Sequence, residues 1–322
     1  MRDNVVPFRA RRPWEATMRT ERIRGRDGTE LQYWVLGEGR KTLLLANGLG
    51  GRLFAWDPLL ERFWRDYQII TWDYRGLFES GSPASHRKLS VPHHADDALT
   101  ILDAEGIDRA VLMGWSMGVQ VSLELAACEP HRIAGLVLMN GTHGHTLASG
   151  FQPFFRVPGV ASFVRAGLAH ARRYPGESTT MRSLGRLAQF LMNNFVFQFT
   201  APGRQDEMRR TMTKYFDHVL GESFENYLRL FLEIDAHSVF HVLQDIEAPT
   251  YIISGLFDIL TPPRHSFELA WVMPHAEHQF LWRSSHFSLL ERPDLLLPKI
   301  ARFLDERAQW VAPSGASSSV TG

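Results

Sequence analysis

The pentapeptide Gly114-Trp115-Ser116-Met117-Gly118 is the part of the sequence whose residue types and spacing most clearly suggest chemistry. A serine hydroxyl is a poor nucleophile unless it is exposed, lies beside a general base and has donors nearby for a developing oxyanion. The pentapeptide joins a buried apolar run to a helical pattern, and a tight strand–serine–helix turn would expose Ser116. The two glycines would let that turn close without a side-chain clash. The pattern therefore predicts a nucleophilic serine, with the backbone N–H of Met117 aimed at an oxyanion.

The elements that must position this serine alternate along the first half of the chain. Apolar runs and alternating patterns predict strands at residues 30–36, 41–47, 67–73, 109–115 and 132–140. Helical spacing predicts helices between them at residues 57–66, 92–105 and 117–128. Strict alternation of strand and helix is typical of βαβ units, so the predicted fold class is α/β with a parallel sheet.

The alternation stops between His143 and Phe240, where the chain is rich in Arg and Phe and mostly helical in period. It resumes with strands at 248–255 and 277–282, a helix at 263–271 and a final amphipathic helix. Two late strands alone would have no sheet to join, so one split domain is favoured over two consecutive domains. The predicted organisation is a flexible arm (1–17), a core (18–142 and 241–308), a helical cap (143–240) and a disordered Ser/Gly-rich tail (309–322).

Composition excludes several classes of protein. Lys plus Arg and Asp plus Glu each number 35, so the chain lacks the basic excess typical of proteins that bind nucleic acid or anionic membranes. No stretch approaches the roughly 18 consecutive apolar residues of a membrane helix, and no signal peptide is recognisable. The single cysteine, Cys128, rules out an intrachain disulfide and a Cys-rich zinc site. Composition leaves a reducing compartment or a disulfide-free secreted protein, and without a recognisable signal peptide or membrane helix we expect a cytoplasmic protein. We also expect a small-molecule acyl partner, and leave the oligomeric state open.

From residue 20 to residue 307 the chain resembles the α/β-hydrolase superfamily. The Ser116 pentapeptide matches the family's G-x-S-x-G nucleophile elbow. The family's His-Gly-x-Gly loop reads Asn-Gly-Leu-Gly-Gly at 47–51, and its D-x-R-G-x-G-x-S stretch reads D-Y-R-G-L-F-E-S at 73–80. The resemblance implies a mostly parallel eight-stranded sheet flanked by helices, with an inserted helical cap.

The resemblance also implies the remaining members of a catalytic triad. Asp258 lies in the acid loop G-L-F-D-I-L-T-P-P, and His286 lies in the histidine loop S-S-H-F-S-L-L-E-R-P. His286 would take the proton of Ser116, and Asp258 would orient and stabilise the imidazolium. The backbone N–H groups of Leu49 and Met117 would form the oxyanion hole. No cofactor and no metal are implied.

A serine nucleophile in this superfamily implies acyl chemistry: cleavage of a carboxylic ester, lactone or thioester through an acyl-enzyme. An acyltransferase, a C–C bond hydrolase, a perhydrolase or a ligand-binding receptor on the same fold remain alternatives. The aromatic residues of the cap either line an apolar acyl pocket or pack the cap onto the sheet. They include Phe151, Phe154, Phe155, Phe163, Phe190, Phe195, Phe197 and Phe199.

Two residues depart from the family pattern. Asn47 replaces the usual His, which we expect to change how the oxyanion loop is braced rather than whether it works. Phe78 replaces a usual Gly, so the loop that contains Arg75 is not expected to follow the family backbone closely.

Other polar residues offer competing interpretations. Asp235 and Asp245 are alternatives to Asp258, but they fall outside the loop at a strand end. His143 and His145 follow a predicted strand and could ligate a metal, but the sequence shows no third ligand, so a polar loop is expected.

Three further single-residue expectations concern packing. His93 and His94 open a predicted helix and are expected to be solvated. Cys128 is expected to pack as a small helix residue, and the Trp115 ring is expected to pack beneath the nucleophile.

Overall fold

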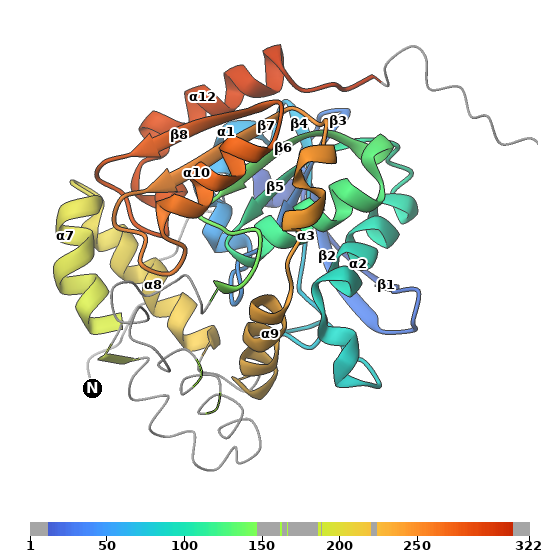
Figure 1. Cartoon of the computed structure of the whole chain (residues 1–322), viewed down its shortest axis with the longest axis horizontal. Helices are drawn as coiled ribbons and strands as arrows, with labels where there is room; N and C mark the ends of the chain where they lie inside the picture. Colours follow the sequence, from blue (N-terminus) through green and yellow to red (C-terminus); the bar gives the residue numbers. More distant parts are fainter. Residues whose placement is uncertain are drawn as a thin grey trace, which may run out of the picture.

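An eight-stranded sheet runs through the centre of the protein in the computed structural model (Figure 1). The structure describes residues 12–146, 186–187, 189–219 and 224–311, together with the isolated residues 162 and 166. The strands are β1 (Arg19–Arg24), β2 (Glu30–Leu36), β3 (Lys41–Ala46), β4 (Tyr67–Trp72), β5 (Ala110–Trp115), β6 (Ile133–Met139), β7 (Thr250–Gly255) and β8 (Ala276–Leu281). Their order in the sheet is β1-β2-β4-β3-β5-β6-β7-β8. β2 pairs antiparallel with β1 and β4, and every other pair is parallel, so the predicted sheet is confirmed.

The central strands are apolar because both of their faces are covered. Every residue of β5, β6 and β7 is buried, as expected for parallel strands between two helical layers. β1 differs, because it lies at the edge of the sheet and none of its residues is buried. Its sequence, R-T-E-R-I-R, is mostly charged, and charged residues on an edge strand discourage unwanted strand pairing.

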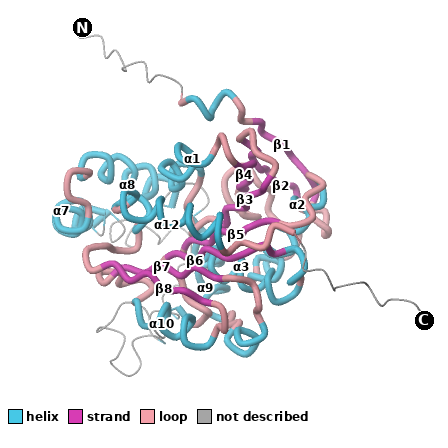
Figure 2. Tube along the Cα trace, turned by 90° about the horizontal axis from the view of Figure 1, so that it is seen from above, coloured by secondary structure: helices cyan, strands magenta, loops and turns pink. Residues whose placement is uncertain are grey.

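Helices cover both faces of the sheet (Figure 2). The apolar sides of α1 (Asp57–Phe63) and α12 (Pro293–Glu306) belong to the core on one face. Those of α2 (Val91–Ala104), α3 (Met117–Cys128) and α10 (Pro263–Val272) belong to the core on the other face. Short turns join these elements: η1 (Pro13–Ala16), η2 (Leu53–Trp56), η3 (His86–Leu89), η4 (Pro130–Arg132), η8 (Phe240–Asp245) and α11 (Ser288–Glu291).

The connection from β6 to β7 contains further helices: the π-helix η7 (Met192–Val196), α7 (Phe197–Thr200), α8 (Gln205–Val219) and α9 (Phe224–Ala236). β6 pairs directly with β7, so the sheet is continuous across this insertion. One side of α8 is buried through residues at helical spacing: Met208, Met212, Phe216 and Val219. The hydroxyl of Tyr215 on α8 donates to the carbonyl of Leu49 at 2.9 Å, which ties the insertion to the loop after β3.

The two chain ends differ from the sequence expectation where the structure describes them. Residues 12–17 were assigned to a flexible arm, but Trp14 is buried and belongs to the core beside α1. Residues 309–311 were assigned to a disordered tail, but the N–H of Gln309 donates to the carbonyl of Ala134 at 2.7 Å. The ring of Trp310 lies 5.8 Å from the ring of Tyr67. The rest of both segments, residues 1–11 and 312–322, lies outside the described residues.

Two packing expectations were wrong. His94 is fully buried rather than solvated, because its helix turns it towards the core together with Val91 and Ala98. Cys128 is exposed rather than packed, because it ends α3. Within the described residues, every helix is too short or too polar to cross a lipid bilayer.

Candidate active site

Ser116 occupies a strained turn between β5 and α3. Its φ of 56° lies in the left-handed region, which side chains other than Gly rarely adopt. The Ser116 N–H donates to the carbonyl of Met139 at 3.0 Å, which fixes the turn against β6. A Cβ at Gly114 would lie 2.4 Å from the Gly118 carbonyl oxygen, and one at Gly118 would lie 2.0 Å from the carbonyl oxygen of Ala46. The turn therefore needs both glycines, as the sequence indicated.

Trp115 connects three parts of this region. The indole Nε1 donates to the carbonyl of His286 at 2.9 Å. On its other side, a Cβ at Gly48 or Gly51 would lie 2.6 or 2.7 Å from the indole ring, so the loop after β3 packs directly on it. Trp115, the residue directly before Ser116, therefore contacts both the loop that contains His286 and the predicted oxyanion loop.

His286 and Asp258 form a buried pair. The ring Nδ1 of His286 lies 3.0 and 2.9 Å from the two carboxylate oxygens of Asp258, and the side chains are 5% and 0% exposed. Asp258 also accepts hydrogen bonds from Leu260 N (3.1 Å), Thr261 N (2.8 Å), Thr261 Oγ1 (2.8 Å) and Asn140 Nδ2 (3.0 Å). These donors hold the carboxylate in one orientation, so the imidazole Nδ1–H is fixed and Nε2 remains the proton acceptor.

The structure brings the serine and histidine loops together through Trp115. Within the described residues, Ser116 Oγ makes no hydrogen bond, and its side chain is partly exposed. Hydrogen bonds between a catalytic nucleophile and its base are often long without substrate. The structure therefore shows an unbonded Ser116 hydroxyl in the turn after Trp115, and an oriented imidazole in the loop whose carbonyl Trp115 bonds.

Asn140 is a positioning residue that the sequence analysis missed. Its φ of 48° is again in the left-handed region, just after β6. Its Nδ2 donates to Asp258 Oδ2 and to the carbonyl of Ser285, both at 3.0 Å. One buried amide thus joins the acid loop to the residue before His286.

Glu291 is a second positioning residue that the sequence analysis missed, and it holds the loop that contains His286. Its buried carboxylate accepts hydrogen bonds from Ser284 Oγ (2.7 Å), Ser285 N (2.7 Å), Ser285 Oγ (2.6 Å) and Thr200 Oγ1 (2.6 Å). The first three partners lie directly before His286, and the fourth lies on α7. Its position in the apolar run S-L-L-E was the only sequence signal, because a Glu in such a run needs a polar partner when buried.

The two predicted oxyanion donors are available. Within the described residues, the backbone N–H groups of Leu49 and Met117 donate to no acceptor. The Leu49 carbonyl is held from outside by Tyr215, and burial raises the pKa of Tyr215 well above its usual value, so its hydroxyl remains a donor. Two N–H groups without partners at these positions suit a developing negative charge.

Asn47 braces the predicted oxyanion loop. Its Nδ2 donates to Trp72 O (2.8 Å) and Thr71 Oγ1 (3.2 Å), and its Oδ1 accepts from Trp56 Nε1 (2.7 Å). The Tyr74 hydroxyl donates to the Asn47 carbonyl at 2.6 Å. An uncharged amide therefore anchors this loop through both of its polar atoms.

Phe78, the second residue that departs from the family pattern, lies in the loop of Arg75 and has an unusual backbone conformation. Phe78 has a φ of 53°, a conformation that favours the Gly usual in the family. Its ring lies 4.8 Å from the Arg52 guanidinium, which is bidentate with Asp73 at 2.9 and 2.7 Å. Burial raises the pKa of Asp73 to about 6, against the opposing effect of Arg52. Phe78 thus combines an unfavourable backbone conformation with a ring contact to the Arg52–Asp73 ion pair.

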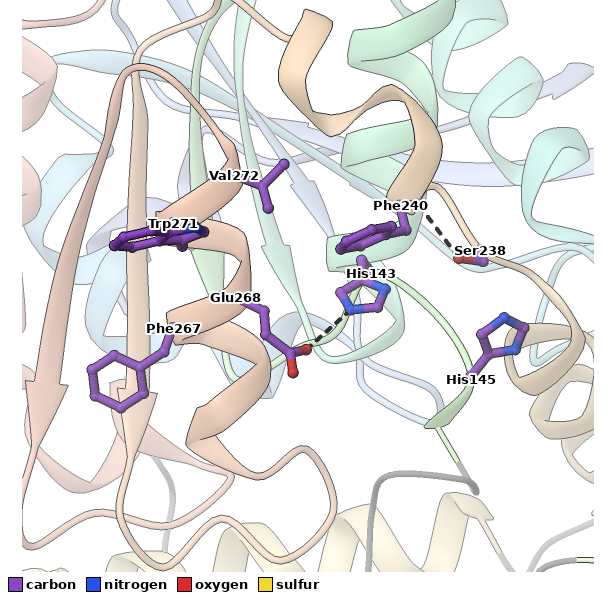
Figure 3. Close-up of a pocket in the computed structure, with 8 residues that line it drawn as sticks. All are labelled: His143, His145, Ser238, Phe240, Phe267, Glu268, Trp271 and Val272. Carbon is purple, nitrogen blue, oxygen red and sulfur yellow. Dashed lines mark hydrogen bonds and ion pairs between the residues drawn. The ribbon is translucent and has the colours of Figure 1, made fainter.

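The rival acids do not share this environment. Asp245 is exposed in η8. Asp235 is buried, and its carbonyl lies 3.2 Å from Nδ1 of His145. Of the described residues, only Asp258 places a carboxylate at the His286 ring. His143 and His145 do not face each other, and His143 instead approaches Glu268 (Figure 3).

The aromatic residues of the insertion divide between packing and exposure. Phe197 is fully buried, with its ring 6.1 Å from that of Phe287, the residue after His286. Of the other aromatic residues that the sequence analysis named, the three that are described are about half exposed or more: Phe190, Phe195 and Phe199. Phe151, Phe154, Phe155 and Phe163 lie outside the described residues.

Comparison with known proteins finds a family match and several relatives. The model of the alpha/beta hydrolase fold family matches residues 41–293. “Putative carbamate hydrolase RutD” of Agrobacterium fabrum is 26% identical over 268 residues, covering 82% of this chain and 92% of that protein. “Epoxide hydrolase 4” of Mus musculus is 27% identical over 195 residues, covering 55% of this chain and 54% of that protein. The enol-lactonase of Burkholderia xenovorans superposes with a TM-score of 0.70 at 26% identity, covering 89% of this chain and 100% of that one.

Proposed function

Because the chain belongs to the alpha/beta hydrolase fold family, we propose that it is a serine hydrolase that cleaves a carboxylic ester, lactone or thioester through an acyl-enzyme at Ser116. The observation that carries this proposal is the buried Asp258–His286 pair at 2.9 Å. The backbone carbonyl of His286 accepts a hydrogen bond from Trp115, the residue before Ser116. A carboxylate that already has four other donors has no structural need for a histidine beside it, whereas a catalytic base needs such support.

The mechanism follows from these positions. Ser116 Oγ attacks the acyl carbon while His286 Nε2 takes its proton, and the carbonyl π electrons move to oxygen. The N–H groups of Leu49 and Met117 stabilise that oxyanion, each worth about 3 kcal/mol when such a donor is removed. The tetrahedral intermediate collapses, and the leaving group receives the proton from His286. Water then repeats the sequence on the acyl-enzyme, which releases the acid and frees Ser116. Asp258 stays ionised throughout and stabilises the imidazolium.

We assign residues 143–240 as a cap over this site and the substrate as a small acyl compound with an apolar part. The bond from Tyr215 to Leu49 and the packing of Phe197 on Phe287 support a cap that rests on the catalytic loops. The zero net charge fits a substrate held by shape and apolar contact rather than by a field. The cytoplasmic location stays a prediction from the sequence.

A carbamate is the second candidate substrate class, because the RutD relative is named for it and spans most of the chain. The same serine would attack a carbamate carbonyl, and His286 would protonate the departing amine or alcohol. An epoxide is a weaker candidate, because Ser116 stands where an epoxide-opening member of the superfamily is expected to carry Asp.

A fluorophosphonate probe tests the nucleophile. We expect it to label the wild-type chain but not Ser116→Ala, while the exposed Ser85→Ala variant labels like the wild type. Turnover should fall roughly 10⁴- to 10⁶-fold in Ser116→Ala. An unlabelled wild-type chain would favour a ligand-binding receptor, and a labelled Ser116→Ala variant would place the nucleophile elsewhere.

A panel of p-nitrophenyl esters, lactones, thioesters and aryl carbamates then ranks the substrate classes by kcat/KM. Apolar acyl groups should be turned over faster than charged ones of the same size. Fastest turnover of charged esters would contradict the apolar pocket, and fastest turnover of carbamates would replace the first candidate by the second.

A further inference from the structure

Three potential metal ligands converge on the face of the sheet that carries α10. His143 follows β6, and His265 and Glu268 lie one turn apart on α10. The Glu268 carboxylate oxygen Oε2 lies 3.3 Å from His143 Nε2 and 3.3 Å from His265 Nδ1. One ligand atom from each of the three residues lies within 4.8 Å of the other two. Figure 3 shows Glu268 and His143 pointing towards each other from separate elements.

The spacing fits a tetrahedral metal ion. Zinc binds imidazole nitrogen and carboxylate oxygen at about 2.0–2.1 Å, so two ligand atoms at a tetrahedral angle stand about 3.3–3.4 Å apart. Both measured nitrogen–oxygen distances are 3.3 Å. Two of the three pairs of ligand atoms therefore already stand at the spacing of a tetrahedral site, and all three atoms lie within 4.8 Å of one another.

Among the described residues, His265 lacks the hydrogen bonds that a buried imidazole normally makes. His265 is only 3% exposed, yet neither of its ring nitrogens has a hydrogen-bond partner in the described part of the chain. His143 differs, because its unpaired nitrogen is Nδ1, whereas Nε2 is the atom that faces Glu268. Buried polar atoms are nearly always paired, and an unpaired one indicates a missing partner.

We propose that His143, His265 and Glu268 bind one divalent transition-metal cation of the Zn²⁺ type. Two imidazoles and one carboxylate favour zinc and its neighbours over Ca²⁺ or Mg²⁺, which prefer oxygen ligands. His143 and Glu268 also line a pocket of about 780 Å³ with Phe240 and Trp271. A bound ion would therefore lie beside this pocket, from which water could reach it.

The ion would link the loop after β6 to helix α10, and both of these segments adjoin residues that contact or contain Asp258. His143 lies just after Asn140, which bonds Asp258, and His265 opens the helix after the Asp258 loop. Metal binding would therefore stabilise the β6 loop against α10 without touching the Ser116 site. This inference does not depend on the proposed hydrolase function, because it concerns binding alone.

The test is a Zn²⁺ titration of the full chain after removal of metal with a chelator. We expect one Zn²⁺ per chain by calorimetry, and a visible absorption band of tetrahedral Co²⁺ when Co²⁺ is used instead. His143→Gln and Glu268→Gln should each weaken binding at least about tenfold, because even outer-shell changes cost that much. His131→Gln, at a side chain that is 71% exposed, is the matched control and should bind like the wild type.

The Ser116→Ala variant should also bind Zn²⁺ like the wild type, which separates this site from the proposed active site. Glu268 is 49% exposed, so its Gln variant is expected to fold, and thermal melting without metal checks this. Zn²⁺ should raise the melting temperature of the wild type more than that of either ligand variant. Absence of stoichiometric binding, or equal affinity in His143→Gln, Glu268→Gln and the wild type, would overturn the proposal.

Discussion

Glu291→Gln is the substitution that most directly tests how the histidine loop is held. Glutamine keeps the shape of the side chain but replaces one carboxylate oxygen by an amide group that donates. The Ser285 N–H requires an acceptor, so the remaining oxygen must face it. The amide then faces the hydroxyls of Thr200 and Ser285, which must turn round to accept. The variant should fold, with the loop before His286 held less firmly.

The four hydrogen bonds to Glu291 set the size of the effect. A bond to a charged acceptor contributes about 1.5–3 kcal/mol, against about 0.5–1.5 kcal/mol for a neutral one, a difference of about 1 kcal/mol per bond. Four bonds give an upper limit of about 4 kcal/mol, and neighbouring bonds are not additive. We therefore expect the free energy of unfolding to fall by about 2–3 kcal/mol.

Catalysis should suffer as well, because a displacement of about 1 Å in a catalytic group costs on the order of 100-fold in rate. We expect the rate constant of fluorophosphonate labelling at Ser116 to fall between about 10- and 100-fold. Urea unfolding followed by tryptophan fluorescence measures the stability. Glu61→Gln, at a side chain that is 59% exposed, is the matched control and should stay within about 0.5 kcal/mol of the wild type.

Two outcomes would refute the reasoning about Glu291. If the variant unfolds within about 0.5 kcal/mol of the wild type, the four bonds do not stabilise the loop. If it loses stability but is labelled at the wild-type rate, the bonds stabilise the fold without positioning His286.

Two further predictions concern the elbow and the response to pH. Gly118→Ala should lower the free energy of unfolding by about 1–3 kcal/mol and slow the labelling of Ser116, because the new Cβ would lie 2.0 Å from the Ala46 carbonyl oxygen. Gly81→Ala is the control for both measurements, because its Cβ would meet nothing closer than 3.4 Å. Burial lowers the pKa of His94 from 6.5 to about 3, so between those values the unfolded chain binds a proton that the folded chain does not, and stability falls as the pH falls. His94→Gln should flatten this dependence between pH 6 and pH 4 by about 1 kcal/mol per pH unit, measured by urea unfolding.

Each of these has a contradicting result. Wild-type stability and labelling in Gly118→Ala would mean that the turn is less tight than the structure indicates. Parallel pH dependences in the wild type and His94→Gln would mean that His94 does not set the acid sensitivity.

The parallel core could be predicted from the sequence because its strands are continuous apolar runs. β5, β6 and β7 each lie within two residues of their predicted ends. β1 had no such signal, because R-T-E-R-I-R carries a single apolar residue at an exposed edge. The alternation of exposed and half-buried residues in β1 comes from its pairing with β2, which no local pattern encodes.

The proposed catalytic residues lie in local motifs, whereas the residues that hold them in place do not. Ser116, Asp258 and His286 each follow a strand in a loop of recognisable composition. Asn140 and Glu291 act through partners that are distant in the sequence, such as the 118 residues between Asn140 and Asp258. Sequence patterns record which face of an element is apolar, but not which buried polar atoms meet across loops. His94 is a partial exception, because it shares helical spacing with the buried Val91 and Ala98, which indicates the inner face of α2.

The candidate metal cluster is another case in which the sequence pattern does not indicate which polar side chains meet in the fold. The spacing His143-x-His145 drew attention to a pair whose members do not face each other, because the Nδ1 atom of His145 lies 3.2 Å from the Asp235 carbonyl instead. The two residues that approach His143 lie on α10, more than a hundred residues later, and α10 reaches that position only because β7 pairs with β6 across the whole insertion. A ligand set assembled by sheet topology leaves no spacing in the sequence. The 3.3 Å approaches to Glu268 and the unpaired buried nitrogens of His265 are then the observations that reveal it.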